Sequence, residues 1–193
     1  MKPRRTGIFG GLFDPPHIAH CIIAQTVLEE FDLHTVIFVP AGNPPHKKKY
    51  SPYSVRCEMT RAAIRNNPLF QISDIERHLR GKTYTIDVVH ALKDQYKGDL
   101  FLIIGSDQWE EFETWKTPNA LLNTCSIIVV SRPGYDTTTL QRSTKNIFVA
   151  HCPMIDISST MIRKKVSQNE SIRYLVPSEV LKLIQKKKLY RKT

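Results

Sequence analysis

Short runs of apolar residues recur along the chain, and segments with helical spacing of apolar residues separate them. The runs at 36–39, 100–104 and 127–130 are apolar throughout rather than alternating with polar residues. A strand that is covered on both faces has no polar side, so runs of this kind are typical of a parallel sheet. We therefore predict six strands, at 6–9, 35–39, 70–75, 100–104, 126–130 and 147–150.

The helical segments carry one apolar stripe each, at the spacing of an amphipathic helix. Thr83 or Thr85 is a candidate N-cap for the third helix, Ser158 or Ser159 for a later one, and Pro177 suits the first helical position of the last. The stripes span 18–31, 55–64, 86–92, 161–166 and 180–184. Alternation of strands and helices predicts an α/β fold with a doubly wound, mostly parallel sheet.

The length of 193 residues suits one domain, because a single hydrophobic core extends comfortably to this size. We expect one domain over 1–193, with small C-terminal helices, over about 158–193, packed on it. No apolar run approaches the ~20 residues of a membrane span. The basic N-terminus is not followed by the apolar core of a signal peptide. We therefore expect a cytoplasmic protein.

The four cysteines are widely separated and include no Cys-x-x-Cys pair. Each of them lies in or beside an apolar segment, so we expect reduced, mostly packed thiols. A disulfide scaffold or a zinc site is disfavoured by the same spacing. The residues are Cys21, Cys57, Cys125 and Cys152.

The formal net charge of +10 suits a protein that binds nucleic acid or small polyanionic ligands. Lysine and arginine cluster at 47–49, at 163–165 and at 186–188. The first two clusters flank the motifs described below, whereas the third suits a solvated helix end. Charge alone therefore leaves RNA binding open.

The turn after the first predicted strand contains two adjacent glycines, Gly10 and Gly11, and then two histidines, His17 and His20. The glycines allow a ligand to approach the backbone closely. The following helix start offers N–H groups and a positive dipole end to an anion, and the imidazoles can donate to phosphate oxygens. Neither a Gly-x-Gly-x-x-Gly nor a Walker pattern is present, and no adjacent Cys, His or Glu completes a metal site. We favour phosphate binding over a core role for the histidines.

A second polar cluster, at residues 157–163, reads Ile-Ser-Ser-Thr-Met-Ile-Arg. Serine and threonine at a helix start provide hydroxyl and backbone donors to an anion. Arg163 lies one turn further on, where its guanidinium can fork onto phosphate oxygens. An ordinary N-cap followed by a basic helix explains the pattern equally well when it is taken alone.

Together, the two clusters resemble the signatures of the adenylyltransferases of the nucleotidylyltransferase superfamily, in order and in spacing. The resemblance implies a Rossmann-like nucleotidylyltransferase fold, with His17, His20 and Arg163 as catalytic residues. Leu12 and Ala19 depart from the family pattern, which usually has Thr or Ser and Gly at these positions. The implied ATP-binding residues are Phe9, Gly10, Gly11, His17, His20, Arg132, Ser158, Ser159, Thr160 and Arg163.

Three further segments resemble the nicotinate mononucleotide adenylyltransferases in particular: the loop at 40–47, Thr-Tyr-Thr at 83–85, and Gly-Ser-Asp at 105–107 followed by a tryptophan. The resemblance implies that Trp115 stacks on the pyridine ring, although the nearby Trp109 is an alternative. Gly105 and Asp107 are implied to lie near the nucleotide sugar. The implied mononucleotide-binding residues are His46, Lys47, Thr83, Tyr84, Thr85 and Trp115.

The resemblance therefore implies an enzyme that transfers the adenylyl group of ATP to nicotinate mononucleotide, giving nicotinate adenine dinucleotide and pyrophosphate. The acceptor's phosphate is already ionised, so positioning and charge neutralisation are the protein's task. We expect Mg²⁺ as a cofactor held by ATP and water, with no protein metal site. The alternatives are nicotinamide mononucleotide or another phosphorylated acceptor, and, in a different class, RNA binding. Nucleic acid is the less favoured partner, and homo-oligomer formation stays open.

Overall fold

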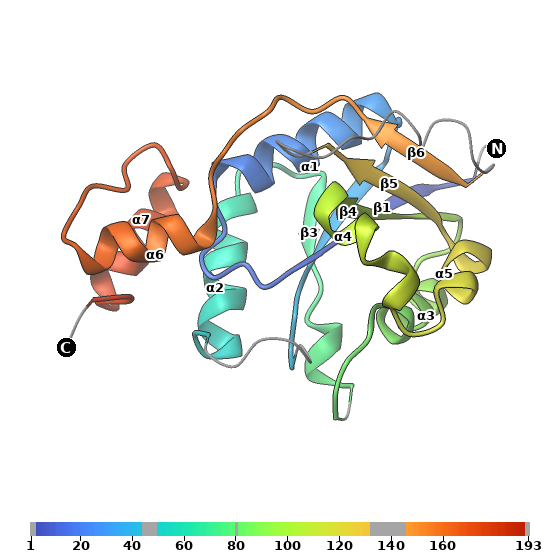
Figure 1. Cartoon of the computed structure of the whole chain (residues 1–193), viewed down its shortest axis with the longest axis horizontal. Helices are drawn as coiled ribbons and strands as arrows, with labels where there is room; N and C mark the ends of the chain where they lie inside the picture. Colours follow the sequence, from blue (N-terminus) through green and yellow to red (C-terminus); the bar gives the residue numbers. More distant parts are fainter. Residues whose placement is uncertain (1–2, 44–49, 80, 132–145, 192–193) are drawn as a thin grey trace.

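The computed structural model describes residues 3–43, 50–79, 81–131 and 146–191. Its centre is a six-stranded parallel sheet with the strand order β3-β2-β1-β4-β5-β6 (Figure 1). The strands are β1 (Arg5–Gly11), β2 (Thr35–Pro40), β3 (Phe70–Ile72), β4 (Asp99–Gly105), β5 (Ser126–Val130) and β6 (Ile147–Ala150). The helices are α1 (Ile18–Glu30), α2 (Tyr53–Ile64), α3 (Thr85–Gln95), α4 (Ser106–Glu110), α5 (Pro118–Thr124), α6 (Ser159–Ser167) and α7 (Ser178–Lys186), with 3-10 turns η1 (Ile75–Arg77) and η2 (Phe112–Thr114).

Both faces of the sheet are covered by helices, which explains the continuously apolar strands. On one face, side chains such as Ile8 and Val129 pack with those of α3 and α5. On the other, Phe38 and Ile103 pack with α1 and with Ile64 at the end of α2. Alternate residues of each central strand therefore enter one of two hydrophobic clusters, and the predicted α/β fold is confirmed.

The chain runs outward in both directions from the centre of the sheet. From β1 it builds β2 and β3 on one side, and it then crosses to build β4, β5 and β6 on the other. Strands β1 and β4 are therefore neighbours at the point where the order reverses. In open α/β sheets this point, beyond the carboxyl ends of the strands, is where ligands bind. The last two residues of β1, Gly10 and Gly11, lie at this point, and so does Gly105, the last residue of β4.

Helices α6 and α7 lie beside α2, away from the sheet (Figure 1). Met59 of α2, Ile162 of α6, and Val180 and Ile184 of α7 form a third cluster of buried side chains. The C-terminal helices thus pack on the rest of the protein through α2. We continue to expect that they belong to one domain with the sheet.

Most predicted strand limits agree with the structure within one or two residues, but the third strand is shorter than predicted. It ends at Ile72 rather than continuing to Ile75. The hydroxyl of Ser73 accepts a hydrogen bond from the Ile75 N–H, which turns the chain into η1. Serine side chains favour such turns because they compete with the ladder for backbone donors.

The helix caps agree with the sequence in part. Ser158 caps α6 as predicted, with its hydroxyl accepting from the Met161 N–H at 3.1 Å. Tyr84, and neither neighbouring threonine, is the N-cap of α3. Pro177 lies at the N-cap of α7, one position before the predicted one, so that the helix begins at Ser178.

Within the described ranges, no helix has the length and apolar character needed to cross a membrane. All four cysteines are free thiols. Cys57, Cys125 and Cys152 are buried, whereas Cys21 is half-buried.

Candidate nucleotide-binding site

The two glycines at the end of β1 differ in what surrounds them. A Cβ added at Gly10 would meet nothing within 4 Å, and Gly10 is exposed, so a ligand can approach the backbone here. A Cβ at Gly11 would lie 3.0 Å from the ring of Phe13. Phe13 has a φ of 50° and is buried beneath the turn. Gly11 therefore makes room for the turn, and Gly10 faces open space.

The histidine pair begins α1. His17 is the N-cap residue and His20 the third helical residue, and their rings stack with centroids 3.7 Å apart. The backbone N–H of His17 donates to Nδ1 of His20 at 3.1 Å. A neutral His20 that accepts at Nδ1 carries its proton on Nε2. Its Nε2–H is then the donor that we expect to meet a phosphate oxygen.

The start of α1 offers fewer backbone donors than the sequence suggests. The His17 N–H is used by His20, and the Ile18 N–H donates to the carbonyl oxygen of Leu175 at 3.0 Å. The expectation of free N–H groups is therefore wrong at these two positions. A segment between α6 and α7 supplies the partner, which no local pattern reveals. We therefore expect side chains to contribute more to phosphate binding than the backbone of the helix start does.

The second polar cluster contacts the turn of the first. The hydroxyl of Ser159 donates to the Pro15 carbonyl at 2.8 Å, and Nη1 of Arg163 donates to the Asp14 carbonyl at 2.7 Å. Nη2 of Arg163 donates to the hydroxyl of Thr160 at 3.1 Å. A guanidinium has five N–H donors, so these two bonds leave it further capacity for an anion. Two motifs that lie far apart in the sequence thus meet beside the carboxyl end of β1.

Phe9 is a predicted ATP contact that the structure places mainly in the core. Its side chain is 7% exposed and packs between the rings of Phe13 and Phe38. The ring of Phe13 also lies edge-on to His20, with centroids 5.0 Å apart. Phe9 therefore packs behind Phe13, which in turn contacts His20. Only the backbone of Phe9 is suited to contact a nucleotide.

The predicted acceptor side begins at the start of α3. Thr83 is buried, and its hydroxyl donates to Oε2 of Glu76 at 2.5 Å. The same carboxylate oxygen accepts from the Gly42 N–H at 2.8 Å. Glu76 therefore links the loop after β2 to the start of α3. This role could not be predicted from the sequence, because a lone glutamate forms no recognisable pattern. Thr85 is the first residue of α3 and is half-buried.

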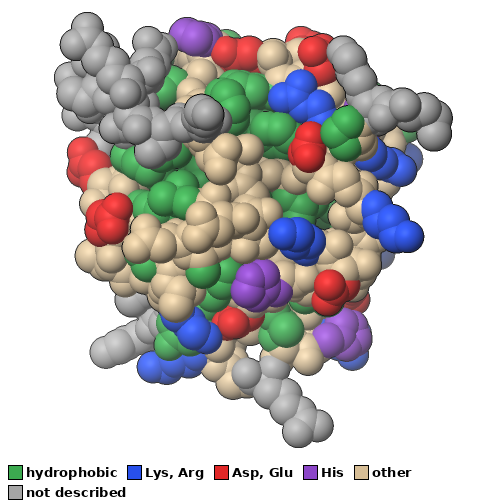
Figure 2. Space-filling model, turned by 90° about the vertical axis from the view of Figure 1, so that its right-hand side faces the viewer, with side chains coloured by type: hydrophobic (Ala, Val, Ile, Leu, Met, Phe, Trp, Pro, Cys, Tyr) green, Lys and Arg blue, Asp and Glu red, His purple; other side chains and the backbone are tan. Residues whose placement is uncertain are grey.

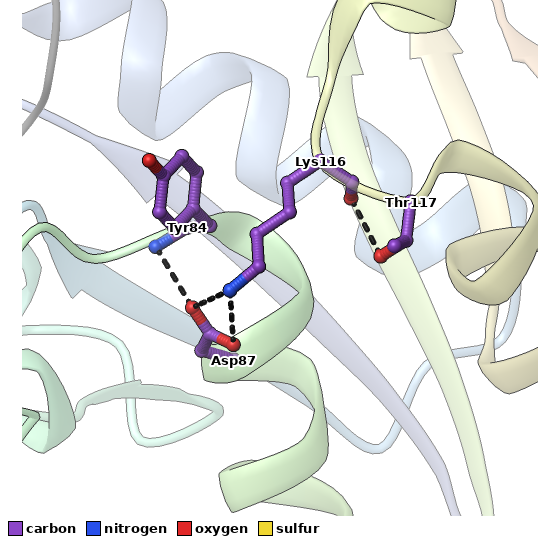
Figure 3. A network of polar contacts seen from close by, with 4 residues as sticks. All are labelled: Tyr84, Asp87, Lys116 and Thr117. Carbon is purple, nitrogen blue, oxygen red and sulfur yellow. Dashed lines mark hydrogen bonds and ion pairs between the residues drawn. The ribbon is translucent and has the colours of Figure 1, made fainter.

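An ion pair joins the start of α3 to the segment after η2 (Figure 3). Nζ of Lys116 lies 3.3 Å from each carboxylate oxygen of Asp87 and 4.6 Å from the ring centre of Tyr84. Asp87 also accepts from the Tyr84 N–H at 3.4 Å. Since Trp115 directly precedes Lys116, the pair brings the predicted stacking residue close to Tyr84, another predicted mononucleotide-binding residue.

Both tryptophans border the same hydrophobic cluster. The ring of Trp109 stacks on Phe112, with centroids 4.9 Å apart and planes 16° apart. Trp115 lies 5.5 Å from Phe112 and is tilted by 48°. One face of Trp109 is therefore covered by a buried ring, which favours Trp115 for stacking on a ligand. Trp109 stays as the alternative.

The remaining predicted site residues fall into two groups. Gly105 ends β4 beside β1, and the half-buried Asp107 follows in α4, at the edge of the sheet where the switch point lies. His46, Lys47 and Arg132 lie outside the described residues.

No group of three or more His, Cys, Asp or Glu side chains that suits a metal ion occurs in the part of the chain that the structure describes. The phosphates of a bound nucleotide would supply the hard oxygen ligands that Mg²⁺ prefers, and a magnesium ion carried on them stays our expectation.

The chain matches the model of the cytidylyltransferase-like family over residues 8–165, and it belongs to that family. Within it, the chain belongs to the nicotinate-nucleotide adenylyltransferases. It is 40% identical to a probable nicotinate-nucleotide adenylyltransferase of Rubrobacter xylanophilus over 97% of the chain and 92% of the relative. It is also 38% identical to a relative with the same description from Desulfitobacterium hafniense, over 98% of the chain and 97% of the relative.

The fold is also that of solved structures. A Plasmodium falciparum nicotinic acid mononucleotide adenylyltransferase complexed with NaAD superposes with a TM-score of 0.84 at 20% identity, covering 97% of each chain. A putative nicotinate-nucleotide adenylyltransferase from Vibrio parahaemolyticus gives a TM-score of 0.71 at 21% identity, covering 98% of this chain and 97% of the other.

Proposed function

We propose that this protein transfers the adenylyl group of ATP to nicotinate mononucleotide, yielding nicotinate adenine dinucleotide and pyrophosphate. One observation carries the proposal. The two phosphate-binding motifs of the family meet beside the carboxyl end of β1 through Ser159 and Arg163, whose partners in the turn are 144 and 149 residues away in the sequence. A polyanion that lies along Gly10 would then face hydroxyl, guanidinium and imidazole donors together.

The reaction proposed is an in-line displacement. A phosphate oxygen of the mononucleotide attacks the α-phosphorus of ATP, the new P–O bond forms, and the bond to the β-phosphate oxygen breaks with release of pyrophosphate. The attacking oxygen carries no proton that must be removed first, so no general base is needed. Arg163 neutralises negative charge on the phosphoryl oxygens, and His17 and His20 stabilise it by hydrogen bonding. When bound, Mg²⁺ supplies additional charge neutralisation on the triphosphate.

For the acceptor, we propose that the pyridine ring stacks on Trp115 and that its carboxylate meets the start of α3 near Thr85. Backbone and hydroxyl donors at a helix start suit a carboxylate. Asp87 lies in this first turn, but Lys116 pairs with it and offsets its charge. With the charge of Asp87 offset, the donors at the start of α3 favour the acid over the amide of the pyridine mononucleotide.

RNA binding is the competing function, and the face of the molecule that Figure 2 draws does not support it. Figure 2 shows basic and acidic side chains interspersed on the face that it draws, without a continuous basic stripe. Nonspecific RNA binding depends on such a stripe with interleaved aromatics. We propose a cytoplasmic enzyme whose partners are ATP and nicotinate mononucleotide, and homo-oligomer formation stays open.

The proposal is tested by incubating the protein with ATP and Mg²⁺ and with each pyridine mononucleotide separately, and by measuring pyrophosphate release. We expect release with nicotinate mononucleotide, and slower release with the amide. Salt-sensitive retention of RNA, with no pyrophosphate released from ATP in the presence of either acceptor, would instead assign the protein to the competing class.

A further inference from the structure

Hydrogen bonds from α6 and α2 hold the turn between β1 and α1 in place. The carbonyl oxygens of Asp14 and Pro15 accept the two hydrogen bonds from α6 described above. The carbonyl of Leu12 accepts from Nη1 of Arg56 at 3.0 Å. Arg56 belongs to α2 and is fully buried. The position of the turn therefore depends on elements that are distant in the sequence.

The carboxylate of Asp14 is the centre of this arrangement. Asp14 is 2% exposed. Its Oδ1 accepts from the hydroxyl of Tyr190 at 2.6 Å, and its Oδ2 accepts from the Ser51 N–H at 3.0 Å. A carboxylate that is buried so deeply requires donors, because an unsatisfied charge in a protein interior is strongly destabilising. Tyr190 supplies one of them from 176 residues further along the chain.

The surroundings of Tyr190 keep its hydroxyl protonated, so that it can donate to Asp14. It lies just beyond α7, half-buried, with its hydroxyl also 3.7 Å from Sδ of Met59. Burial and the hydrogen bond to Asp14 raise the pKa of its phenol well above the ordinary value. The hydroxyl therefore keeps its proton over the whole range of assay pH.

A shift of Asp14 would displace residues of both predicted phosphate-binding motifs. Nη1 of Arg163 is bonded to the Asp14 carbonyl. The preceding residue, Phe13, packs against the ring of His20. We propose that Tyr190 is a positioning residue for ATP: by holding Asp14, it fixes the turn that sets His20 and Arg163 in place. This inference rests on the proposed function, since it takes these two residues to bind ATP phosphates.

The test is Tyr190→Phe, which removes the hydroxyl and keeps the ring. We expect the KM for ATP to rise about tenfold, because a hydrogen bond to a charged group is lost, while the KM for nicotinate mononucleotide stays within about twofold. Tyr174→Phe is the matched control, since Tyr174 lies in the same C-terminal part and is 82% exposed. We expect the control to match the wild type in both KM values.

Calorimetric binding of a non-hydrolysable ATP analogue separates this inference from the proposed function. The Kd of Tyr190→Phe should rise about tenfold even if the acceptor has been misassigned. If Tyr190→Phe folds poorly, Asp14→Asn is the second variant. It keeps one of the two acceptor oxygens, so we expect a smaller loss that is still selective for ATP. A purely structural role would lower the melting temperature and the active fraction while leaving both KM values and the Kd unchanged. That result would overturn the inference.

Discussion

His20 is the single residue on which the proposed catalysis depends most directly. Its Nδ1 accepts from the His17 N–H, and we propose that its Nε2–H stabilises charge on the reacting phosphate. His20→Ala should lower kcat by about 10²–10³-fold, the usual effect of losing one donor to a transition-state oxyanion. The melting temperature should fall modestly, because the ring stacks on His17 and accepts its N–H, but kcat should fall far more than the folded fraction does.

Steady-state kinetics and a thermal melt check this prediction together. His90→Ala is a suitable control, since His90 is exposed on α3. Wild-type turnover by a folded His20→Ala protein would remove the histidine from the mechanism.

Trp115 carries the second prediction at this scale. Trp115→Ala should raise the KM for nicotinate mononucleotide about tenfold, as loss of an aromatic stacking partner does, and should leave the KM for ATP unchanged. Trp109→Ala is the comparison, because Trp109 stacks on Phe112 and borders the same cluster. A rise in the mononucleotide KM for Trp109→Ala alone would transfer the stacking role to that residue.

Between elements, the Asp87–Lys116 ion pair is the contact that joins α3 to the segment after η2 (Figure 3). Lys116→Met keeps the apolar stem but leaves Asp87 uncompensated beside the predicted carboxylate site. The KM for the acid should rise about three- to fivefold, and that for the amide should change less. Because both side chains are partly exposed, at 46% and 37%, the melting temperature should hardly move.

Two measurements sharpen this prediction. Added salt should raise the wild-type KM for the acid toward that of Lys116→Met, because it screens an exposed charge. Lys182→Met is the matched control, since Lys182 forms an exposed pair with Glu179 on α7. Equal effects of Lys116→Met on acid and amide would argue against an electrostatic role.

The elements themselves could be predicted wherever their burial is uniform. Strands such as β5 are apolar throughout, and the sequence located β5 and β6 with the limits that the structure has. The start of α3 could not be predicted in the same way. Threonine is a good N-cap residue, but the hydroxyl of Thr83 donates to Glu76 instead. The N-cap of α3 is Tyr84. A tertiary partner overrode the local preference.

At the scale of the whole molecule, the two signatures could be found from the sequence, but the contacts that join them could not. The motif residues are recognised by type and spacing. The bond from Tyr190 to Asp14 and that from Ile18 to Leu175 have no local pattern, because they depend on how α6 and α7 return to the turn after β1. The chemistry of the site therefore stays a prediction from residue types, whereas the contacts that hold the turn in place come from the tertiary fold.

Buried thiols make the stability of the whole molecule sensitive to alkali. Burial raises the pKa of Cys21, Cys125 and Cys152 to about 11. In the unfolded chain a thiol ionises near pH 8.5, so the unfolded state loses these protons first. The stabilisation is therefore complete below roughly pH 8.5 and is lost as the pH rises toward 11.

Urea unfolding at pH 8 and pH 10 should accordingly show a lower free energy of unfolding at pH 10. Cys21→Ser should reduce that difference, because serine does not titrate in this range, and Cys21 is half-buried and so tolerates the exchange. The same thiols should react slowly with a thiol reagent at pH 8 in the native protein and rapidly in urea, since the thiolate is the reactive form. Rapid native reaction of all three would show that their environment does not hold the proton, and the alkaline loss of stability would then need another cause.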